Sequence, residues 1–359
     1  MKQDAETSHL KHVSHWKLYL VILLILFGIV FVLSLNLGYA HIPFSDILKI
    51  LSKQVPFLND LVDSSGISNT SEVIITQLRL PRVICGALVG ASLATAGVIY
   101  QGIFRNPMAD PYVIGSMSGA SLGAALVLVL GVGVSFLGVN TLQIFAFVCS
   151  FATVLAVYSI SKTGSRVPVT MLLLTGIAIT YFQSAIVTFL QTVATDKVHR
   201  GLAFWLIGSL SSTETWSDVW SVFPFLVLGF VAAYLYSRDL NVLALGEDQA
   251  QHLGVEIEKL KRILLICATL MTAAAVSISG LIGFVGLIIP HLTRLIVGPD
   301  HRILLPTSAV VGASFLMISD SIARVIMGSG EAPVGVITAL AGGPFFIYLL
   351  RRKKRGYTM

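Results

Sequence analysis

The chain has 359 residues, of which 55% are hydrophobic and only 12% are charged. Soluble domains carry about a quarter charged residues, so this composition excludes an ordinary water-facing surface and favours a chain that lies in lipid. The net charge of +6 could suggest nucleic acid. However, the basic residues lie between apolar runs and gather in the tail 351–355, a pattern typical of membrane topology and contact with anionic lipid headgroups. We therefore expect a lipid bilayer partner and no nucleic acid.

Apolar runs of roughly 20 residues recur along the chain, which is the length that an α-helix needs to cross a bilayer, whereas barrel strands are about half as long. The expected spans are 16–37, 80–104, 113–133, 140–161, 168–193, 217–237, 262–280, 281–297, 304–326 and 334–350. The seventh and eighth form one stretch broken at Ser279-Gly280 and Gly283, so nine spans is the competing count. The pattern predicts an all-α polytopic membrane protein with about ten transmembrane helices in one domain, 1–359.

The loop charges predict an orientation. With ten spans and both termini in the cytoplasm, most of the 24 Lys and Arg residues fall on the inner side, as the positive-inside rule requires. This parse makes 1–16 a cytosolic N-terminal extension, 38–78 an extracytoplasmic loop and 238–261 a cytosolic segment. We expect a multi-pass protein of the cytoplasmic membrane.

Small residues are spaced for close helix packing. Gly86 and Gly90 form one GxxxG pair, and Gly115, Gly119 and Gly123 repeat the spacing. Because lipid provides little hydrophobic drive between helices, such residues promote backbone contact either within the chain or between subunits. Val-Gly-Ala-Ser occurs at both 89–92 and 311–314, which is too short to establish a repeat.

Charged residues mark the outer ends of two spans. Arg79 and Arg82 flank the start of span two and, three residues apart, are expected to point in similar directions at the outer surface. They could anchor the helix at the interface or dock carboxylates of a delivering protein. Asp320 and Arg324 are four apart on span nine, which predicts a structural ion pair.

The connection between spans six and seven contains a short helix, Leu245–Gly254. Gly246 can cap it, Glu247 suits the first turn of the helix dipole, and Gly254 can end it.

The same helix carries Ala250 and Leu253 with no cytosolic domain to bury them. These apolar side chains predict insertion into the groove of a partner protein. The alternative is a helix that lies on the inner face of the membrane.

Two further regions are candidates for a transport path. Gly280–His291 combines glycines, Phe284 and Pro290 in one apolar element, and Pro290 is expected to kink the helix. This element could be irregular packing or a moving part near the path. In span five the candidate lining residues are Met171, Thr175, Tyr181, Phe182 and Gln183.

Several motifs in order resemble the iron-siderophore, haem and cobalamin permeases (FecCD-type) of bacterial ABC importers. They are Arg79–Arg82, Asn106–Tyr112, Phe204-Trp205 with Gly208-Ser209, Leu245–Gly254, Gly283–His291 with Arg294, and Glu331, Pro333 and Gly335, within a match from about 17 to 352. The resemblance implies the type II importer architecture, with a homodimer and a path on its two-fold axis. It also implies two cytosolic ATPases and an extracytoplasmic substrate-binding protein.

The same resemblance assigns roles to residues. It implies that Arg79, Arg82 and Arg324 face glutamates of the binding protein, and that Leu245–Gly254 is the coupling helix for the ATPases. The chain has no Gly-Lys dipeptide and hence no phosphate-binding loop of the GxxxxGK[ST] type. We therefore expect no catalytic role and no bound cofactor or metal, with ATP and Mg²⁺ on the ATPase subunits.

The expected function is the permease subunit of an importer for an iron chelate, either a ferric siderophore or haem. A cobalamin importer of the same family is the alternative. A secondary transporter or membrane enzyme acting alone is a third possibility. It receives little support because ion-coupled transporters usually carry intramembrane carboxylates, and here only Asp320 stands out.

Overall fold

The computed structural model describes residues 2–38, 40–54, 67–133, 135–136, 139–211, 215–326 and 331–356. Nearly all regular structure in this part of the chain is helical, which confirms the predicted all-α class. The elements in chain order are α1 (Lys2–Asn36), α2 (Phe44–Lys53), α3 (Asn69–Val73), the π-helix η2 (Ile74–Arg79), α4 (Leu80–Ile103), α5 (Ser116–Leu130), β1 (Ser135–Phe136), β2 (Val139–Asn140), α6 (Thr141–Ser161), α7 (Val169–Val193), α8 (Asp196–Ile207), α9 (Trp216–Leu235), α10 (Ser237–Leu243), α11 (Glu247–His252), α12 (Ile257–Ser279), α13 (Val285–Val297), α14 (His301–Ile326) and α15 (Val334–Gly356).

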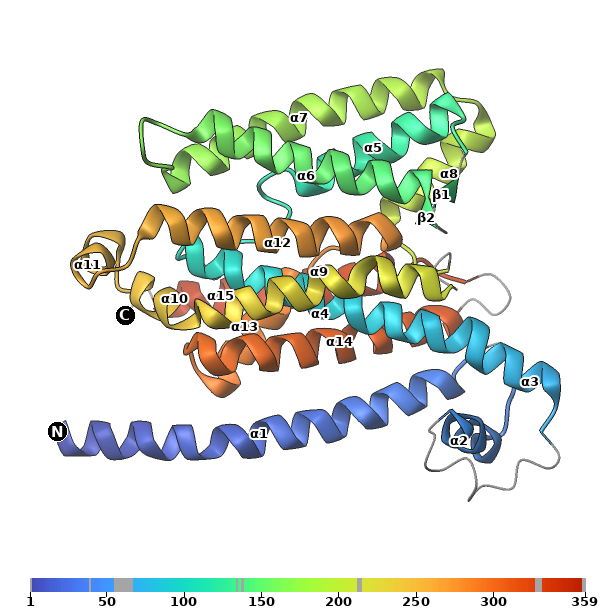
Figure 1. Cartoon of the computed structure of the whole chain (residues 1–359), viewed down its shortest axis with the longest axis horizontal. Helices are drawn as coiled ribbons and strands as arrows, with labels where there is room; N and C mark the ends of the chain where they lie inside the picture. Colours follow the sequence, from blue (N-terminus) through green and yellow to red (C-terminus); the bar gives the residue numbers. More distant parts are fainter. Residues whose placement is uncertain are drawn as a thin grey trace.

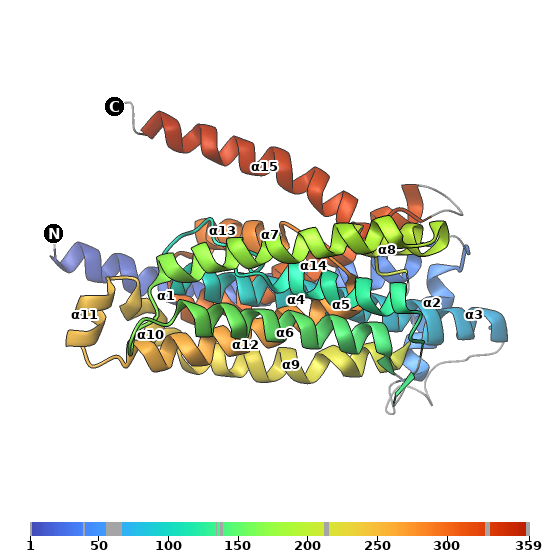
Figure 2. The same cartoon turned by 90° about the horizontal axis from the view of Figure 1, so that it is seen from above.

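The long helices lie roughly parallel in layers (Figure 1). Helices α5, α6 and α7 form one outer layer, α4, α9 and α12 lie in the middle, and α14 and then α1 follow on the other side. Helix α15 leaves the body at an angle (Figure 2). The start of α1, helices α10 and α11 and the end of α15 share one end of the molecule, whereas α2, α3 and α8 lie at the opposite end.

The helices account for the ten predicted spans. Within the described residues, seven are long and apolar enough to cross a membrane, and the shorter apolar helices are Ser116–Leu130, Val285–Val297 and Val334–Leu349. Helix α13 has only 13 residues, so it is about 20 Å long and shorter than the ~30 Å hydrocarbon core. The eighth span therefore combines a short helix with non-helical chain.

That non-helical chain is the break at 280–284, as the sequence predicted. The Tyr112 hydroxyl donates a hydrogen bond to the Ile282 carbonyl at 2.7 Å, and the Ser209 N–H donates to the Ser279 carbonyl at 2.8 Å. Irregular backbone at membrane depth is tolerated where protein groups satisfy it in this way. Phe284, with φ at 69°, turns the chain into α13 through a conformation that costs a non-glycine residue about 1–3 kcal/mol.

The glycine pattern serves packing within the chain. Gly90 on α4 faces the carbonyl of Gly312 on α14, and a Cβ at either position would collide with the other helix. Gly119 and Gly123 on α5 approach the backbone of α6 in the same manner. The two Val-Gly-Ala-Ser segments thus pack against each other, so the repetition reflects a shared need for close helix approach.

The loop 38–78 is more helical than expected. A short helix, α2, lies near its start and buries Ile47 and Ile50. The predicted span 80–104 coincides with α4, but the helical stretch begins earlier than expected, because α3, η2 and α4 are continuous from Asn69 to Ile103. Residues 55–66 of this loop lie outside the described part of the chain.

Candidate functional site

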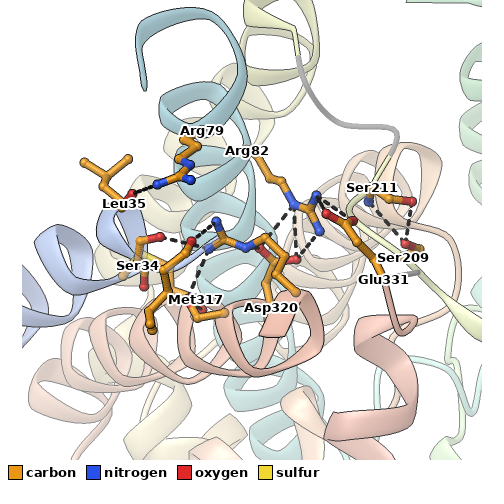
Figure 3. Close-up of polar contacts among 12 residues, drawn as sticks. Ser34, Leu35, Arg79, Arg82, Ser209, Ser211, Met317, Asp320 and Glu331 are labelled. Atoms are coloured by element: carbon orange, nitrogen blue, oxygen red, sulfur yellow. Dashed lines mark hydrogen bonds and ion pairs between the residues drawn. The ribbon is translucent and has the colours of Figure 1, made fainter. Parts of the chain in front are cut away.

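An ionic cluster joins the start of α4 to the end of α14 (Figure 3), at the end of the molecule opposite α11 (Figure 1). The Arg82 guanidinium on α4 donates to Asp320 on α14, with Nη2 and Oδ1 2.9 Å apart. Its Nη1 donates to Glu331 at 2.8 Å. Arg324 also pairs with Asp320, with Nε 3.0 Å from Oδ2, which confirms the ion pair predicted on span nine.

The other contacts of this cluster involve the end of α1. Arg79 donates to the carbonyls of Leu35 and Asn36, and Arg324 donates to those of Ser34 and Leu37. The last carbonyls of a helix have no partners within the helix and form the negative end of its dipole. Two arginines from other segments therefore cap α1.

The expectation that Arg79 and Arg82 point in similar directions at the surface is wrong. Arg79 turns toward α1, whereas Arg82 turns toward α14 and Glu331 (Figure 3). Both side chains and that of Arg324 are buried. The reason is physical, because unpaired helix carbonyls and the buried Asp320 carboxylate attract the guanidiniums inward. A docking role for these arginines remains a prediction.

A pocket of about 440 Å³ opens beside this cluster. It is lined by residues of α8, of the end of α12 and of the segments that follow α8 and precede α15, and Glu331 joins it to Arg82. Among its lining residues are Phe204, Trp205, Ser209 and Ser211. The pocket therefore presents aromatic and hydroxyl side chains next to the most exposed member of the ionic cluster.

At the other end, the short helix predicted at Leu245–Gly254 is present as α11. Gly246 precedes it with φ at 123°, and Gly254 follows it with φ at 86°, so both positions favour glycine. Leu253 is 65% exposed, as expected for a residue that contacts a partner. The same expectation for Ala250 is wrong, because Ala250 is fully buried against this chain's own helices.

A groove of about 600 Å³ runs beside α11. Its walls come from α11, the start of α12 and the turn between α6 and α7, and they include the carboxylates of Glu247, Asp248, Glu256 and Glu258. Glu247 forms an ion pair with Lys261 of α12 at 2.8 Å. Helix α11 is therefore attached to the membrane helices by charge as well as by packing.

The neighbouring helix α10 is attached to α14. The Asn241 amide donates to Asp300 at 2.8 Å, and Arg302 donates to the same carboxylate at 2.6 Å. Burial acts to raise the pKa of Asp300, but these hydrogen bonds outweigh it and lower the pKa to about 2. Asp300 is therefore ionised at neutral pH and holds the α10 end of the 238–261 segment.

The residues proposed from span five divide between two faces of α7. Tyr181 is 75% exposed, and Met171 and Phe182 are exposed as well, with Thr175 half-buried. Gln183 faces inward, where it accepts a hydrogen bond from Ser118 on α5 and donates one to Thr153 on α6. The outward face of α7 is therefore available to a partner or a path, whereas Gln183 connects three helices.

The remaining path candidates lie at the start and in the middle of α13. Pro290 is buried, whereas Phe284 is half-buried and packs against Gly342 of α15. The break at 280–284 thus contacts α8, α15 and the segment before α5, through Gly208, Gly335 and Tyr112. The geometry places Phe284 and Pro290 next to a break in the helices, while their role on a path stays a prediction.

Sequence reasoning did not assign a role to three of these residues. Glu331 was considered only as part of the motif that ends at Gly335, and Lys261 only as one of the basic residues on the inner side. Glu258 was not singled out. Their functions depend on contacts across up to 249 residues of sequence, as for Arg82 and Glu331. The one local signal was the i, i+3 spacing of Glu258 and Lys261 at the start of an apolar helix.

The fold and the two polar ends define the class of protein. It is a polytopic helical membrane protein with a short helix at one end, α11, that exposes Leu253. Residues 23–352 match the FecCD transport family, and the chain belongs to that family. It is therefore the permease subunit of an ABC importer, a transport component rather than an enzyme. Members of this class work with ATPase and substrate-binding partners.

Relatives of several named specificities are similar to the chain. The cobalamin import system permease protein BtuC of Halobacterium salinarum is 45% identical over 80% of this chain and 76% of its own length. The hemin transport system permease protein HmuU of Yersinia pestis is 38% identical over 77% and 83%. A solved inward-facing putative metal-chelate ABC transporter matches with a TM-score of 0.79, at 34% identity over 93% of this chain and 98% of that one.

Proposed function

We propose that two copies of this chain form the membrane path of an importer for a bulky metal chelate, with an iron chelate as the first candidate. Two candidate partner-binding features lie at opposite ends of the molecule. One is α11 with its exposed Leu253, and the other is the arginine cluster beside the 440 Å³ pocket. This placement is the observation that carries the proposal. An importer needs ATPases at one face and a binding protein at the other.

The positive-inside count supports an orientation in which α11 and both termini are cytoplasmic. In this orientation the cytosolic ATPases contact α11 through Leu245 and Leu253, both of which are exposed. The binding protein approaches the opposite end. There its carboxylates would compete with Glu331, whose side chain is 35% exposed, for the Arg82 guanidinium.

The exposed face of α7 supports the proposed homodimer. A path for a large chelate must be lined by protein, and α7 presents Met171, Tyr181 and Phe182 outward while its other face packs on α5 and α6. Two such faces around a two-fold axis would enclose the path. The proposal also includes that residues 1–359 form a single permease domain.

Cobalamin is the alternative substrate, because a cobalamin permease is among the relatives, at 45% identity. Uptake of labelled cobalamin, haem and a ferric siderophore by cells with and without the chain separates the two. Loss of iron-chelate uptake alone supports the first candidate, and loss of cobalamin uptake alone supports the second. Unchanged uptake of all three contradicts both.

A further inference from the structure

A buried lysine connects α11 to the beginning of α7. Lys261 lies in the first turns of α12, and its side chain is 1% exposed. Its ammonium group donates to Glu247 of α11 at 2.8 Å, to Glu258 of its own helix at 3.4 Å and to the carbonyl of Val167 at 3.4 Å. Val167 lies in the turn between α6 and α7.

Glu258 completes the contact with that turn. Its Oε2 accepts a hydrogen bond from the Val167 N–H at 3.0 Å, so α12 side chains bind both backbone polar groups of Val167. The next residue, Pro168, is the N-cap of α7. Val167, Ala250 and Leu260 also belong to one apolar cluster, which joins the same three segments by packing.

The arrangement resists separation of its parts. A buried ammonium group is stable only while its carboxylate partners stay in contact, since an unpaired buried charge is strongly disfavoured. Moving α11 away from α7 would break the contact of Lys261 with Glu247 or with Val167. The three segments are therefore expected to move as one body.

We propose that Lys261 is a positioning residue that transmits displacement of α11 to the cytosolic end of α7. The inference rests on the proposed function, in which α11 receives motion from the ATPases and the outward face of α7 borders the path. It adds a mechanical connection that involves neither nucleotide nor substrate contact. Glu247 and Glu258 are its two attachment points, one toward α11 and one toward α7.

The test compares Lys261→Met with Lys259→Met in the complex with its ATPases, reconstituted in liposomes. Lys259 is a matched control, because it is two residues away, exposed, and paired only loosely with Glu256 at 3.5 Å. The readout is the number of ATP molecules hydrolysed per substrate transported. We expect Lys261→Met to raise this ratio roughly 2- to 30-fold, the range in which residues between coupled sites act, and Lys259→Met to leave it unchanged.

A purely structural role predicts a different result. In that case Lys261→Met would lower ATP hydrolysis and transport in equal proportion, and the unchanged ratio would overturn the proposal. Glu247→Gln and Glu258→Gln, which keep side-chain size, provide milder variants should Lys261→Met fail to assemble. Each breaks one attachment, so each is expected to raise the ratio, and parental ratios in both would also overturn it.

A second measurement does not depend on the substrate. Spin labels at Gln249 and Ser165, both exposed, report the distance from α11 to the turn before α7 in a cysteine-free chain. We expect one narrow distance distribution in the parental complex with and without nucleotide, and a broad one in Lys261→Met. An equally narrow distance distribution in Lys261→Met contradicts the proposed role of Lys261 in joining α11 to α7. Absence of transport by the parental complex contradicts only the proposed function.

Discussion

Arg82 Nη2 lies 2.9 Å from Asp320 Oδ1, although 238 residues separate the two in sequence. The Asp320 carboxylate also forms an ion pair with Arg324 of its own helix, 3.0 Å from its Nε. Because Arg324 in turn caps α1, this single carboxylate joins α4, α14 and α1 at the end opposite α11. The cluster holds this end of the bundle together while leaving Glu331 partly exposed.

Asp320→Asn should destabilise the protein strongly. The substitution leaves two buried guanidiniums to share Glu331, and breaking a buried ion pair from one side costs about 3–5 kcal/mol. Chemical unfolding in mild detergent measures the loss. A change below about 1 kcal/mol, typical of exposed pairs, would show that the cluster is well solvated.

Glu331→Gln tests the docking role of Arg82. It removes a partly exposed carboxylate that competes for the guanidinium, so we expect little loss of stability and tighter association with the binding protein at low salt. Surface binding assays at two salt concentrations measure the association. Weaker association in Glu331→Gln would mean that Glu331, rather than Arg82, contacts the partner.

Gly90→Val should separate α4 from α14. The added side chain meets the Gly312 carbonyl and the Leu316 side chain, and overpacking of this kind typically costs about 1–3 kcal/mol. Gly28→Val is the matched control, because nothing lies within 4 Å of its Cβ position on α1. The thermal midpoint in detergent should fall only for the first variant, and equal midpoints would contradict the close helix contact.

Cysteine in place of Tyr181 should crosslink two protomers. The outward face of α7 is proposed to border the two-fold axis, and Tyr181 is its most exposed aromatic residue. Cysteine in place of Leu26, exposed on α1, is the control and should remain uncrosslinked in membranes. Dimer bands from Leu26→Cys but not from Tyr181→Cys would place the interface on the other side of the bundle.

Leu253→Asp should release the ATPases. Burial of a leucine side chain contributes about 1.5–3 kcal/mol, so its loss from the proposed contact weakens association by roughly tenfold or more. Leu253→Met retains an apolar side chain and should behave as the parent. Co-purification of the ATPase over a dilution series measures the change, and equal retention in both variants would make α11 a passive linker.

The sequence predicted the helical architecture well because apolar run length is a local property. It located the ten spans, the break after Ser279 and the short helix now seen as α11. It also anticipated the pair of Asp320 and Arg324, which are neighbours on one helix.

What it could not predict depends on distant contacts. The directions of Arg79 and Arg82 are determined by α1 and α14, which no local spacing reveals. Ala250 is buried because the start of α12 folds back onto α11, and Lys261 contacts the turn before α7, which is distant in sequence. Substrate choice is likewise absent from any local pattern.

The most direct test of the proposed function is transport by the reconstituted importer. Liposomes would contain the permease with its ATPases, ATP on the α11 side, and the binding protein loaded with a labelled ferric siderophore, haem or cobalamin on the other. We predict accumulation of one chelate that requires both ATP and the binding protein. Accumulation driven by an ion gradient through the permease alone would contradict the account.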